Sequence, residues 1–216
     1  NNTIAGTQWE SFPTSDGAPL IADMSSDIFS RPLDASKFDL IFAGAQKNLG
    51  PSGVTLVILK KSLLETANEE LASMLQYKIH AKNNSLYNTP PTFAIYVVNE
   101  VLNWIKKNGG LEGIKAMNEK KAKLLYDAID SSELFYCPVK KGSRSLMNVV
   151  FRVKGDNEEL ESRFISEATQ KGLSGLKGHR SVGGLRASIY NAQPYEGVES
   201  LTQFMGIFEK SVVVTA

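Results

Sequence analysis

The sequence predicts an α/β protein with two domains, and three observations lead to this fold class. Two continuous apolar runs, 40–45 and 54–59, flank a turn rich in Gly and Pro, which is typical of two buried strands. Apolar residues recur at helical spacing between 91 and 107. Beyond Gly110 the pattern runs helix, strand, helix, strand, helix, which suits a small α/β domain with an antiparallel or mixed sheet.

The expected elements of the first half follow from local patterns. A short apolar run ends abruptly at Asp23, and Thr89 and Pro90 are suited to the start of the helix at 91–107. The Asn108-Gly109-Gly110 sequence is suited to its end. The other expected elements here are a short helix or turn at 34–39, a helix at 60–74 and a polar loop at 81–88.

The second half is expected to begin with a long amphipathic helix at 111–129. Its outer face is predicted to carry Lys115, Lys120, Lys121 and Lys123. A strand at 145–153, a helix at 157–171 that ends at Gly172, a glycine-rich segment at 173–190 and a last helix at 194–208 complete the prediction. We place the domain boundary near Gly109–Gly110, which gives domains 1–109 and 110–216.

The totals exclude several classes of protein. The 216 residues are 42% hydrophobic and 22% charged, which is enough to bury a core. A net charge of +1 creates no global field for nucleic acid or an anionic membrane, so we expect neither as a partner. No apolar run approaches the roughly 20 residues of a membrane span. The single Cys137 rules out an internal disulfide and favours a reducing compartment such as the cytoplasm.

Lys47 is the first candidate for chemistry. It stands between the two predicted buried strands, and its neighbours Gly44, Ala45, Gly50 and Gly53 are small, which leaves space for a flat, bulky group. A lysine at the end of a buried strand is partly desolvated, which favours the neutral amine that forms Schiff bases with aldehydes. The alternative is an ordinary surface lysine in a strand turn.

Asp23 and the start of the helix at 91–107 are further candidates. Asp23 ends a strand one structural unit before Lys47, where ligands bind in open α/β sheets; the alternative is a loop or capping aspartate. A helix start offers free backbone N–H groups to a phosphate, although most such starts bind nothing.

A basic cluster in the segment 177–186 is the second chemical signal. Lys177, His179, Arg180 and Arg186 occur among several glycines on a loop that leads into a strand. Arginine binds carboxylate or phosphate through two parallel hydrogen bonds, and glycine lets the backbone approach an anion. The alternative is a solvated basic turn.

Together these stretches resemble the phosphoserine aminotransferases, class-V enzymes that use pyridoxal 5'-phosphate (PLP). The matching motifs are AGAQKNLGP at 43–51, ADMSS at 22–26 with SRP at 30–32, YNTPPTF at 87–93, and KGHR at 177–180 through GGLRASIYNA at 183–192. They occur in the family's order and cover nearly the whole chain. The resemblance implies PLP-dependent transferase fold type I: 1–109 would be the remainder of a large mixed-sheet PLP-binding domain with the interdomain helix, and 110–216 a small C-terminal α/β domain.

The resemblance also implies a role for each matching residue. Lys47 would form the Schiff base with PLP and transfer the proton during catalysis, and Asp23 would pair with the ring nitrogen. Thr3 would bind the phenolic oxygen and Gln46 the phosphate, while Asn88 and Thr89 would reach the phosphate in the partner subunit of a homodimer with shared sites. His179, Arg180 and Arg186 would bind the anionic groups of the substrate. No metal is implied.

The implied reaction is amino transfer between glutamate and 3-phosphohydroxypyruvate, giving 2-oxoglutarate and phosphoserine in serine biosynthesis, with a related intermediate of pyridoxine biosynthesis as a second substrate. The chain does not begin with Met, and the family's N-terminal part has no counterpart here, so we expect a fragment that lacks part of the cofactor pocket. Two alternatives stay open: another PLP aminotransferase or desulfurase-type relative, and an inactive truncated or proteolysed domain.

Overall fold

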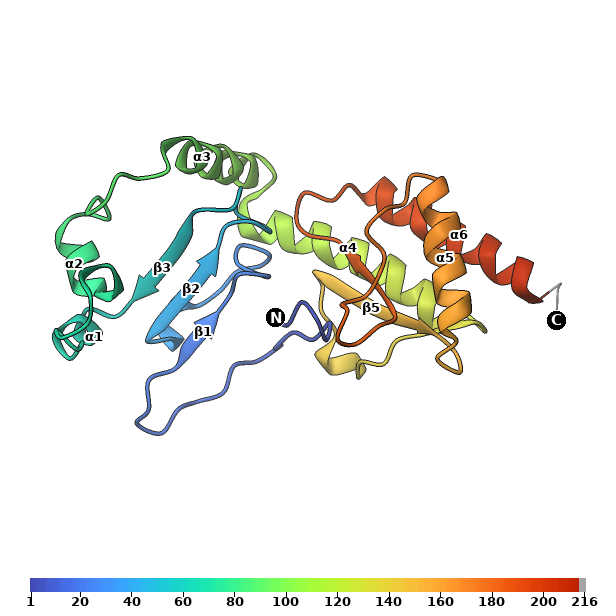
Figure 1. Cartoon of the computed structure of the whole chain (residues 1–216), viewed down its shortest axis with the longest axis horizontal. Coiled ribbons are helices and arrows are strands. Elements are labelled where there is room, and N and C mark those ends of the chain that lie inside the picture. Colours follow the sequence, from blue (N-terminus) through green and yellow to red (C-terminus); the bar gives the residue numbers. More distant parts are fainter. Residues whose placement is uncertain (214–216) are drawn as a thin grey trace. The chain divides into compact units, whose positions relative to one another are not determined.

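Two three-stranded sheets organise the chain, one in each of two units (Figure 1). The computed structural model describes residues 1–213. One unit consists of Pro13–Asn108, and the other combines Asn1–Phe12 with Gly109–Ala216. The division at Asn108 coincides with the glycine pair in the sequence, but the first twelve residues pack with the second half of the chain. Sequence periodicity carries no signal for such a long-range association.

The sheet of the Pro13–Asn108 unit has the order β1-β2-β3. Strand β1 (Ile21–Asp23) runs parallel to β2 (Leu40–Gly44), and β2 runs antiparallel to β3 (Thr55–Leu59). The central strand β2 is apolar on both faces: Ile41 and Ala43 on one face are nearly inaccessible, and Leu40 on the opposite face is buried. The parallel pairing of β1 and β2 brings their carboxyl ends to one edge of the sheet.

The helices of this unit depart from prediction at one place. The predicted helix at 60–74 is wrong: the structure has α1 (Lys61–Glu65), a separate 3-10 turn (Ser73–Leu75) and then α2 (Tyr77–Lys82). Neither α1 nor the 3-10 turn buries a residue, and a helical pattern propagates poorly when no face is covered. A further 3-10 turn spans Ala35–Lys37, and α3 (Thr92–Lys107) lies close to its predicted limits.

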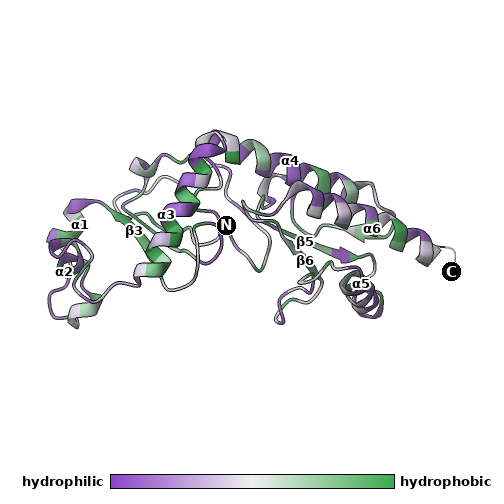
Figure 2. Ribbon diagram, turned by 90° about the horizontal axis from the view of Figure 1, so that it is seen from above, coloured by the Kyte–Doolittle hydropathy of each residue, from purple (hydrophilic) through white to green (hydrophobic). Residues whose placement is uncertain are grey.

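The second unit has an antiparallel sheet of order β4-β5-β6, formed by β4 (Phe135–Tyr136), β5 (Asn148–Val153) and β6 (Leu185–Ser188). Its helices are α4 (Gly110–Ser131), α5 (Glu158–Gln170) and α6 (Tyr195–Val213), with a 3-10 turn at Lys141–Ser143. Both α4 and α6 alternate polar and apolar residues along their length (Figure 2). Five phenylalanines pack together in the core: Phe135, Phe151, Phe164, Phe204 and Phe208.

Lys121 corrects the prediction that it lies on the outer face of the long helix. Its side chain is buried on α4, in line with the inner residues Ile114 and Leu125. The Nζ atom donates to the backbone carbonyls of residues 189, 190, 191 and 193 at 2.7–3.3 Å. Burial lowers the pKa of Lys121 to about 8. The carbonyl cluster that makes the inner position acceptable lies about 70 residues away in sequence, so the helical pattern could not reveal it.

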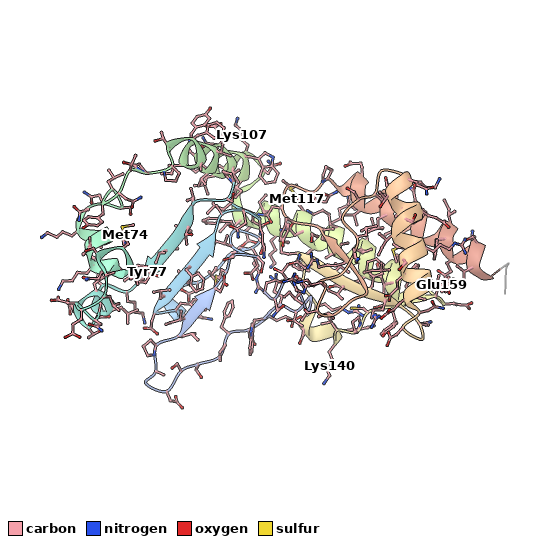
Figure 3. The ribbon with its side chains drawn as sticks, in the orientation of Figure 1. Met74, Tyr77, Lys107, Met117, Lys140 and Glu159 are labelled. Atoms are coloured by element: carbon pink, nitrogen blue, oxygen red, sulfur yellow. The ribbon has the colours of Figure 1, made fainter. Side chains whose placement is uncertain are left out.

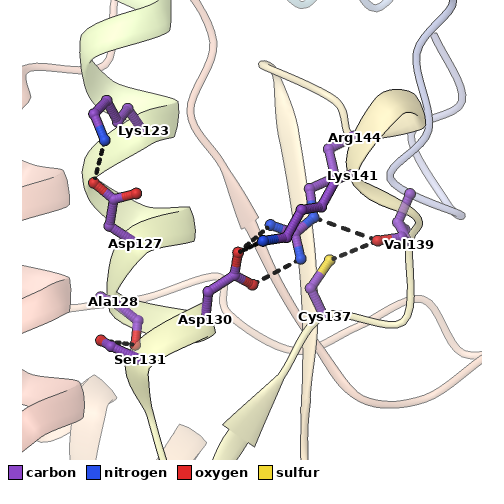
Figure 4. Close-up of polar contacts among 9 residues, drawn as sticks. All are labelled: Lys123, Asp127, Ala128, Asp130, Ser131, Cys137, Val139, Lys141 and Arg144. Atoms are coloured by element: carbon purple, nitrogen blue, oxygen red, sulfur yellow. Dashed lines mark hydrogen bonds and ion pairs between the residues drawn. The ribbon is translucent and has the colours of Figure 1, made fainter.

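An ion pair fastens the loop before β5 to α4 (Figure 4). Arg144 donates from Nη1 and Nη2 to the two carboxylate oxygens of Asp130 at 2.8 and 2.7 Å, and its guanidinium lies over the ring of Tyr126 at 4.6 Å. The hydrogen bond from Arg144 holds the pKa of Asp130 below its usual range. This ion pair fixes residues 143–145, which the first residues of the chain contact.

No helix among residues 1–213 has the length and apolar character that crossing a membrane requires.

Candidate active site

Asp23 lies at the carboxyl end of β1, opposite Phe42 of β2. Its Oδ1 atom accepts the backbone N–H of Ser25 at 2.9 Å and the Ser25 hydroxyl at 2.6 Å. The Ser25 Oγ atom in turn accepts the N–H of Gly44, the last residue of β2, at 3.0 Å. Ser25 therefore ties the ends of the two strands together, and Asp23 Oδ2 receives no hydrogen bond from the described residues.

Lys47 and Gln46 lie in the turn that follows β2. The N–H groups of Leu49 and Gly50 both donate to the carbonyl of Ala45, at 3.1 and 2.8 Å, which closes the backbone into a tight turn. Asn48 attaches this turn to the segment after β1, because its buried side-chain amide donates to the carbonyl of Ile28 at 3.1 Å. Lys47 is half-buried and Gln46 is exposed. The turn thus places Lys47 three residues beyond the end of the strand that neighbours Asp23.

Asn88 and Thr89 precede α3 and are both exposed. The Asn88 amide donates to the carbonyl of Thr89 at 3.1 Å. The capping residue of α3 is Pro91, and no side chain caps the helix, so Thr89 does not have the capping function expected from the sequence. Both side chains face outward on a surface that also carries exposed aromatic residues.

The basic segment forms a closed loop before β6 in the other unit. The N–H of Gly178 donates to the carbonyl of Gly184 at 2.8 Å, and the N–H of Gly183 donates to the carbonyl of His179, also at 2.8 Å. A Cβ atom at Gly178 would lie 2.0 Å from the carbonyl oxygen of Gly183, so only glycine fits there. The closed loop presents His179, whose Nδ1 contacts the Ser181 hydroxyl at 2.7 Å, and the exposed Arg180, which has no hydrogen-bond or ion-pair partner among the described residues.

Arg186 and Thr3 meet within this same unit. Arg186 lies on β6, and its Nη1 atom donates to the backbone carbonyl of Thr3 at 3.4 Å. Its Nε atom is buried and has no hydrogen-bond partner among the described residues. A guanidinium with a buried, unused donor is suited to bind a carboxylate or phosphate oxygen. The sequence therefore identified two residues that are in contact although 183 positions separate them.

The predicted residues thus fall into two groups. Asp23, Gln46, Lys47, Asn88 and Thr89 belong to the first unit, and Thr3, His179, Arg180 and Arg186 to the second. In the first group the Asp23 Oδ2 atom, which has no hydrogen-bond donor within residues 1–213, lies at one strand end, and the amine of Lys47 follows the adjacent strand. These groups fit the protonated ring nitrogen and the aldehyde of a pyridoxal cofactor. Ser25 had no predicted role, although it lies in the ADMSS motif beside Asp23.

Known proteins resemble this chain over most of its length. The aminotransferase class-V family matches residues 9–201. Phosphoserine aminotransferase of Lysinibacillus sphaericus is 58% identical over 97% of this chain, and the chain spans 58% of that relative's length. A solved phosphoserine aminotransferase from Bacillus circulans subsp. alkalophilus superposes with a TM-score of 0.94 at 57% identity, over 98% of this chain and 58% of that one.

A third comparison involves a structure determined with the cofactor. PLP-bound phosphoserine aminotransferase from Trichomonas vaginalis superposes with a TM-score of 0.91 at 44% identity, over 95% of this chain and 58% of that one. These likenesses confirm the predicted fold class, a part of the mixed α/β fold of the PLP-dependent aminotransferases.

Proposed function

Since the chain belongs to the class-V aminotransferase family, we propose that it works as part of a PLP-dependent phosphoserine aminotransferase. The reaction is reversible amino transfer between glutamate and 3-phosphohydroxypyruvate, with 2-oxoglutarate and phosphoserine as the other pair. The observation that carries the proposal is the placement of Asp23 and Lys47 at the ends of adjacent strands, tied together through Ser25. When bound, PLP supplies the aldehyde and the electron-withdrawing ring that transamination requires.

The residues of the first unit would hold the cofactor and transfer the proton. Asp23 Oδ2 would accept the hydrogen bond of the protonated ring nitrogen, and Ser25 keeps the carboxylate oriented by occupying Oδ1. Lys47 would hold the cofactor through its Nζ atom and would carry the proton to and from the substrate's α-carbon. Gln46 would bind the phosphate of the cofactor. The domains predicted as 1–109 and 110–216 are revised in one respect: residues 13–108 form the PLP-binding domain, and residues 1–12 pack with the small domain. Thr3 would bind the phenolic oxygen.

The substrate's two anionic groups are assigned to His179, Arg180 and Arg186. The exposed Arg180 and the unused donor of Arg186 support this assignment. A doubly anionic substrate matches such a cluster better than a small neutral one. Phosphoserine is therefore favoured over the substrate of another aminotransferase of the same fold.

We further propose a homodimer in which Asn88 and Thr89 complete the partner's site. Large apolar side chains are exposed in the surrounding segment, including Leu75 at 68% and Phe93 at 76%, and such surfaces mark interfaces. Met74 and Tyr77 project from the same segment (Figure 3). A cytoplasmic location is also part of the proposal, because a single cysteine is typical of reducing compartments.

Two variants of the holoenzyme test the chemistry. Borohydride makes the bond between PLP and its lysine permanent, and peptide mass mapping then locates that lysine. Lys47→Ala should abolish this attachment, whereas the control Lys61→Ala should retain it. A permanent attachment at another lysine would refute the assignment. Asp23→Asn should lower kcat far more than it changes KM, because the charge pair matters most as electrons move into the ring. A near-normal kcat would contradict that role.

Substrate and subunit assignments have separate tests. Arg180→Ala should lower kcat/KM for phosphoserine by about ten- to a hundredfold, the loss of one charge-assisted hydrogen bond, and much less for serine; Arg163→Ala on α5 is the control. Equal losses for both substrates would mean a structural role. Mixing Lys47→Ala with Thr89→Ala subunits should restore about a quarter of the activity, because half the dimers then contain one intact shared site. No restoration would exclude shared sites.

A further inference from the structure

We propose that Asn1 and Asn148 are positioning residues that fix the loop carrying Thr3, so that the Thr3 hydroxyl is held in place for the cofactor. We define the Thr3 loop as residues 1–8. The inference deepens the proposed function and rests on it, because the cofactor contact of Thr3 is part of that proposal. The hydrogen bonds that carry the inference all lie within one unit of the chain.

The side chain of Asn1 is held at both ends of its amide. Its Nδ2 atom donates to Oδ1 of Asn148 at 3.0 Å, and its Oδ1 atom accepts the hydroxyl of Ser145. Asn148 and Ser145 are completely buried. Asn148 Nδ2 donates in turn to the hydroxyls of Ser188 at 3.2 Å and Tyr190 at 3.0 Å. A buried amide with this set of partners has one permitted orientation, so Asn148 offers Asn1 a fixed acceptor.

A second fastening lies at the other end of the Thr3 loop. The carbonyl of Gly6 accepts the N–H of Ser145 at 3.0 Å, and the side chain of Gln8 accepts the N–H of Leu146 at 3.0 Å. Gly6 has a positive φ of 67°, and a Cβ atom there would lie 2.7 Å from Val150 and 2.9 Å from the carbonyl oxygen of Asn148. The loop therefore lies directly on β5, at a separation that only glycine permits.

Between the two fastenings the loop is closed on itself. The N–H of Asn2 donates to the carbonyl of Thr7 at 2.7 Å, and the N–H of Gly6 donates to the carbonyl of Asn2 at 3.0 Å. The Asn2 side chain accepts the N–H groups of Ile4 and Ala5, each at 2.9 Å. Thr3 consequently moves with the loop as one body, and its position depends on how firmly the two ends are attached.

Arg186 adds a connection to the substrate side. Its bond to the Thr3 carbonyl places a proposed substrate-binding residue and a proposed cofactor-binding residue in direct contact. Catalytic groups act only when they are held within a fraction of an ångström of the productive position. Loosening Asn1 should therefore displace Thr3 from the cofactor and also disturb the guanidinium that contacts it.

The test uses Asn1→Ala, which removes both amide contacts from a half-buried residue and leaves the core intact. In the protein freed of cofactor, amide exchange at Asn2, Gly6 and Ser145 should become about ten- to a hundredfold faster, as expected when the attachment loses two hydrogen bonds. In the holoenzyme, the pH midpoint of the absorbance of bound PLP should move in the same direction as in Thr3→Val, and by less. The control Asn157→Ala removes the cap of α5 and should change neither readout.

Asn1→Asp separates the two contacts, because it keeps the acceptor for Ser145 and removes the donor for Asn148. It should change exchange and absorbance in the same direction as Asn1→Ala but by less, because one of the two contacts is kept. Wild-type exchange and absorbance in this variant would overturn the role of Asn148. The positioning role would be overturned if amide exchange in Asn1→Ala were unchanged. It would also be overturned if the pH midpoint of PLP absorbance were unchanged in Asn1→Ala but shifted in Thr3→Val. Either result leaves the proposed function standing. If Thr3→Val does not move the midpoint, the cofactor contact of Thr3 is wrong and the positioning role falls with it, whereas the Lys47 experiment still reports on the proposed function by itself.

Discussion

Replacing Gly178 with alanine should disable the basic loop without unfolding the unit that carries it. The new Cβ atom would lie 2.0 Å from the carbonyl oxygen of Gly183 and 2.7 Å from that of Gly184, where ordinary contacts begin at 3.4 Å. Both obstacles are backbone atoms, so no side-chain rotation relieves the clash. The loop must open by more than 1 Å, since 3.4 minus 2.0 leaves 1.4 Å at the closer contact.

Opening the loop breaks or strains two backbone hydrogen bonds. One joins the N–H of Gly178 to the carbonyl of Gly184, and the other joins the N–H of Arg186 to the carbonyl of Leu176, each at 2.8 Å. At about 0.5–1.5 kcal/mol per bond, the cost is about 1–3 kcal/mol. A domain with about 5–15 kcal/mol of stability remains folded after such a loss. His179 and Arg180, however, shift by more than a hydrogen bond tolerates.

The assay is kcat/KM of the holoenzyme for phosphoserine together with the thermal midpoint of unfolding. We expect kcat/KM to fall by about ten- to a hundredfold, the equivalent of one displaced charge-assisted bond, and the midpoint to fall by a few degrees. Gly206→Ala is the matched control, because nothing lies within 4 Å of that position on α6. It should stabilise the protein by up to about 1 kcal/mol and leave kcat/KM unchanged. A Gly178→Ala enzyme with wild-type kcat/KM would refute the reasoning.

Three further changes have defined outcomes. Lys121→Met should lower the free energy of unfolding in urea by about 3–5 kcal/mol, because it leaves the buried carbonyls at 189–193 without their donor; a loss below about 1 kcal/mol would show that water replaces the ammonium. Asp130→Asn should reduce the loss of folding stability at acid pH. Arg144 holds the pKa of Asp130 in the folded protein below the ordinary value of 3.8. The ion pair therefore stabilises the fold above pH 3.8, and this stabilisation disappears as the pH falls through the folded-state pKa. Equal acid slopes would contradict this. Gly6→Ala should accelerate amide exchange in residues 2–8, because its Cβ atom would lie 2.7 Å from Val150, and unchanged exchange would mean that β5 can move aside.

Local chemistry in the sequence was sufficient for several elements. The apolar run at 40–45 predicted β2, and the periodicity of 91–107 predicted α3 to within one residue. Asn157 and Gly172 bounded α5 because a capping side chain and a left-handed glycine act within a few residues of the helix end. Apart from Thr3, the candidate site residues lie in motifs of ten or fewer contiguous residues that resemble one family, and their roles stay predictions.

The tertiary structure decided what depends on contacts between distant segments. It placed Lys121 inside, because its acceptors come from residues 189–193, and it ended the helix after Glu65, because no partner covers a further turn. It also joined residues 1–12 to the second half of the chain through Ser145 and Asn148. Periodicity describes which face of an element is apolar, whereas the partner of a buried polar group lies wherever the chain returns, and only the fold specifies that place.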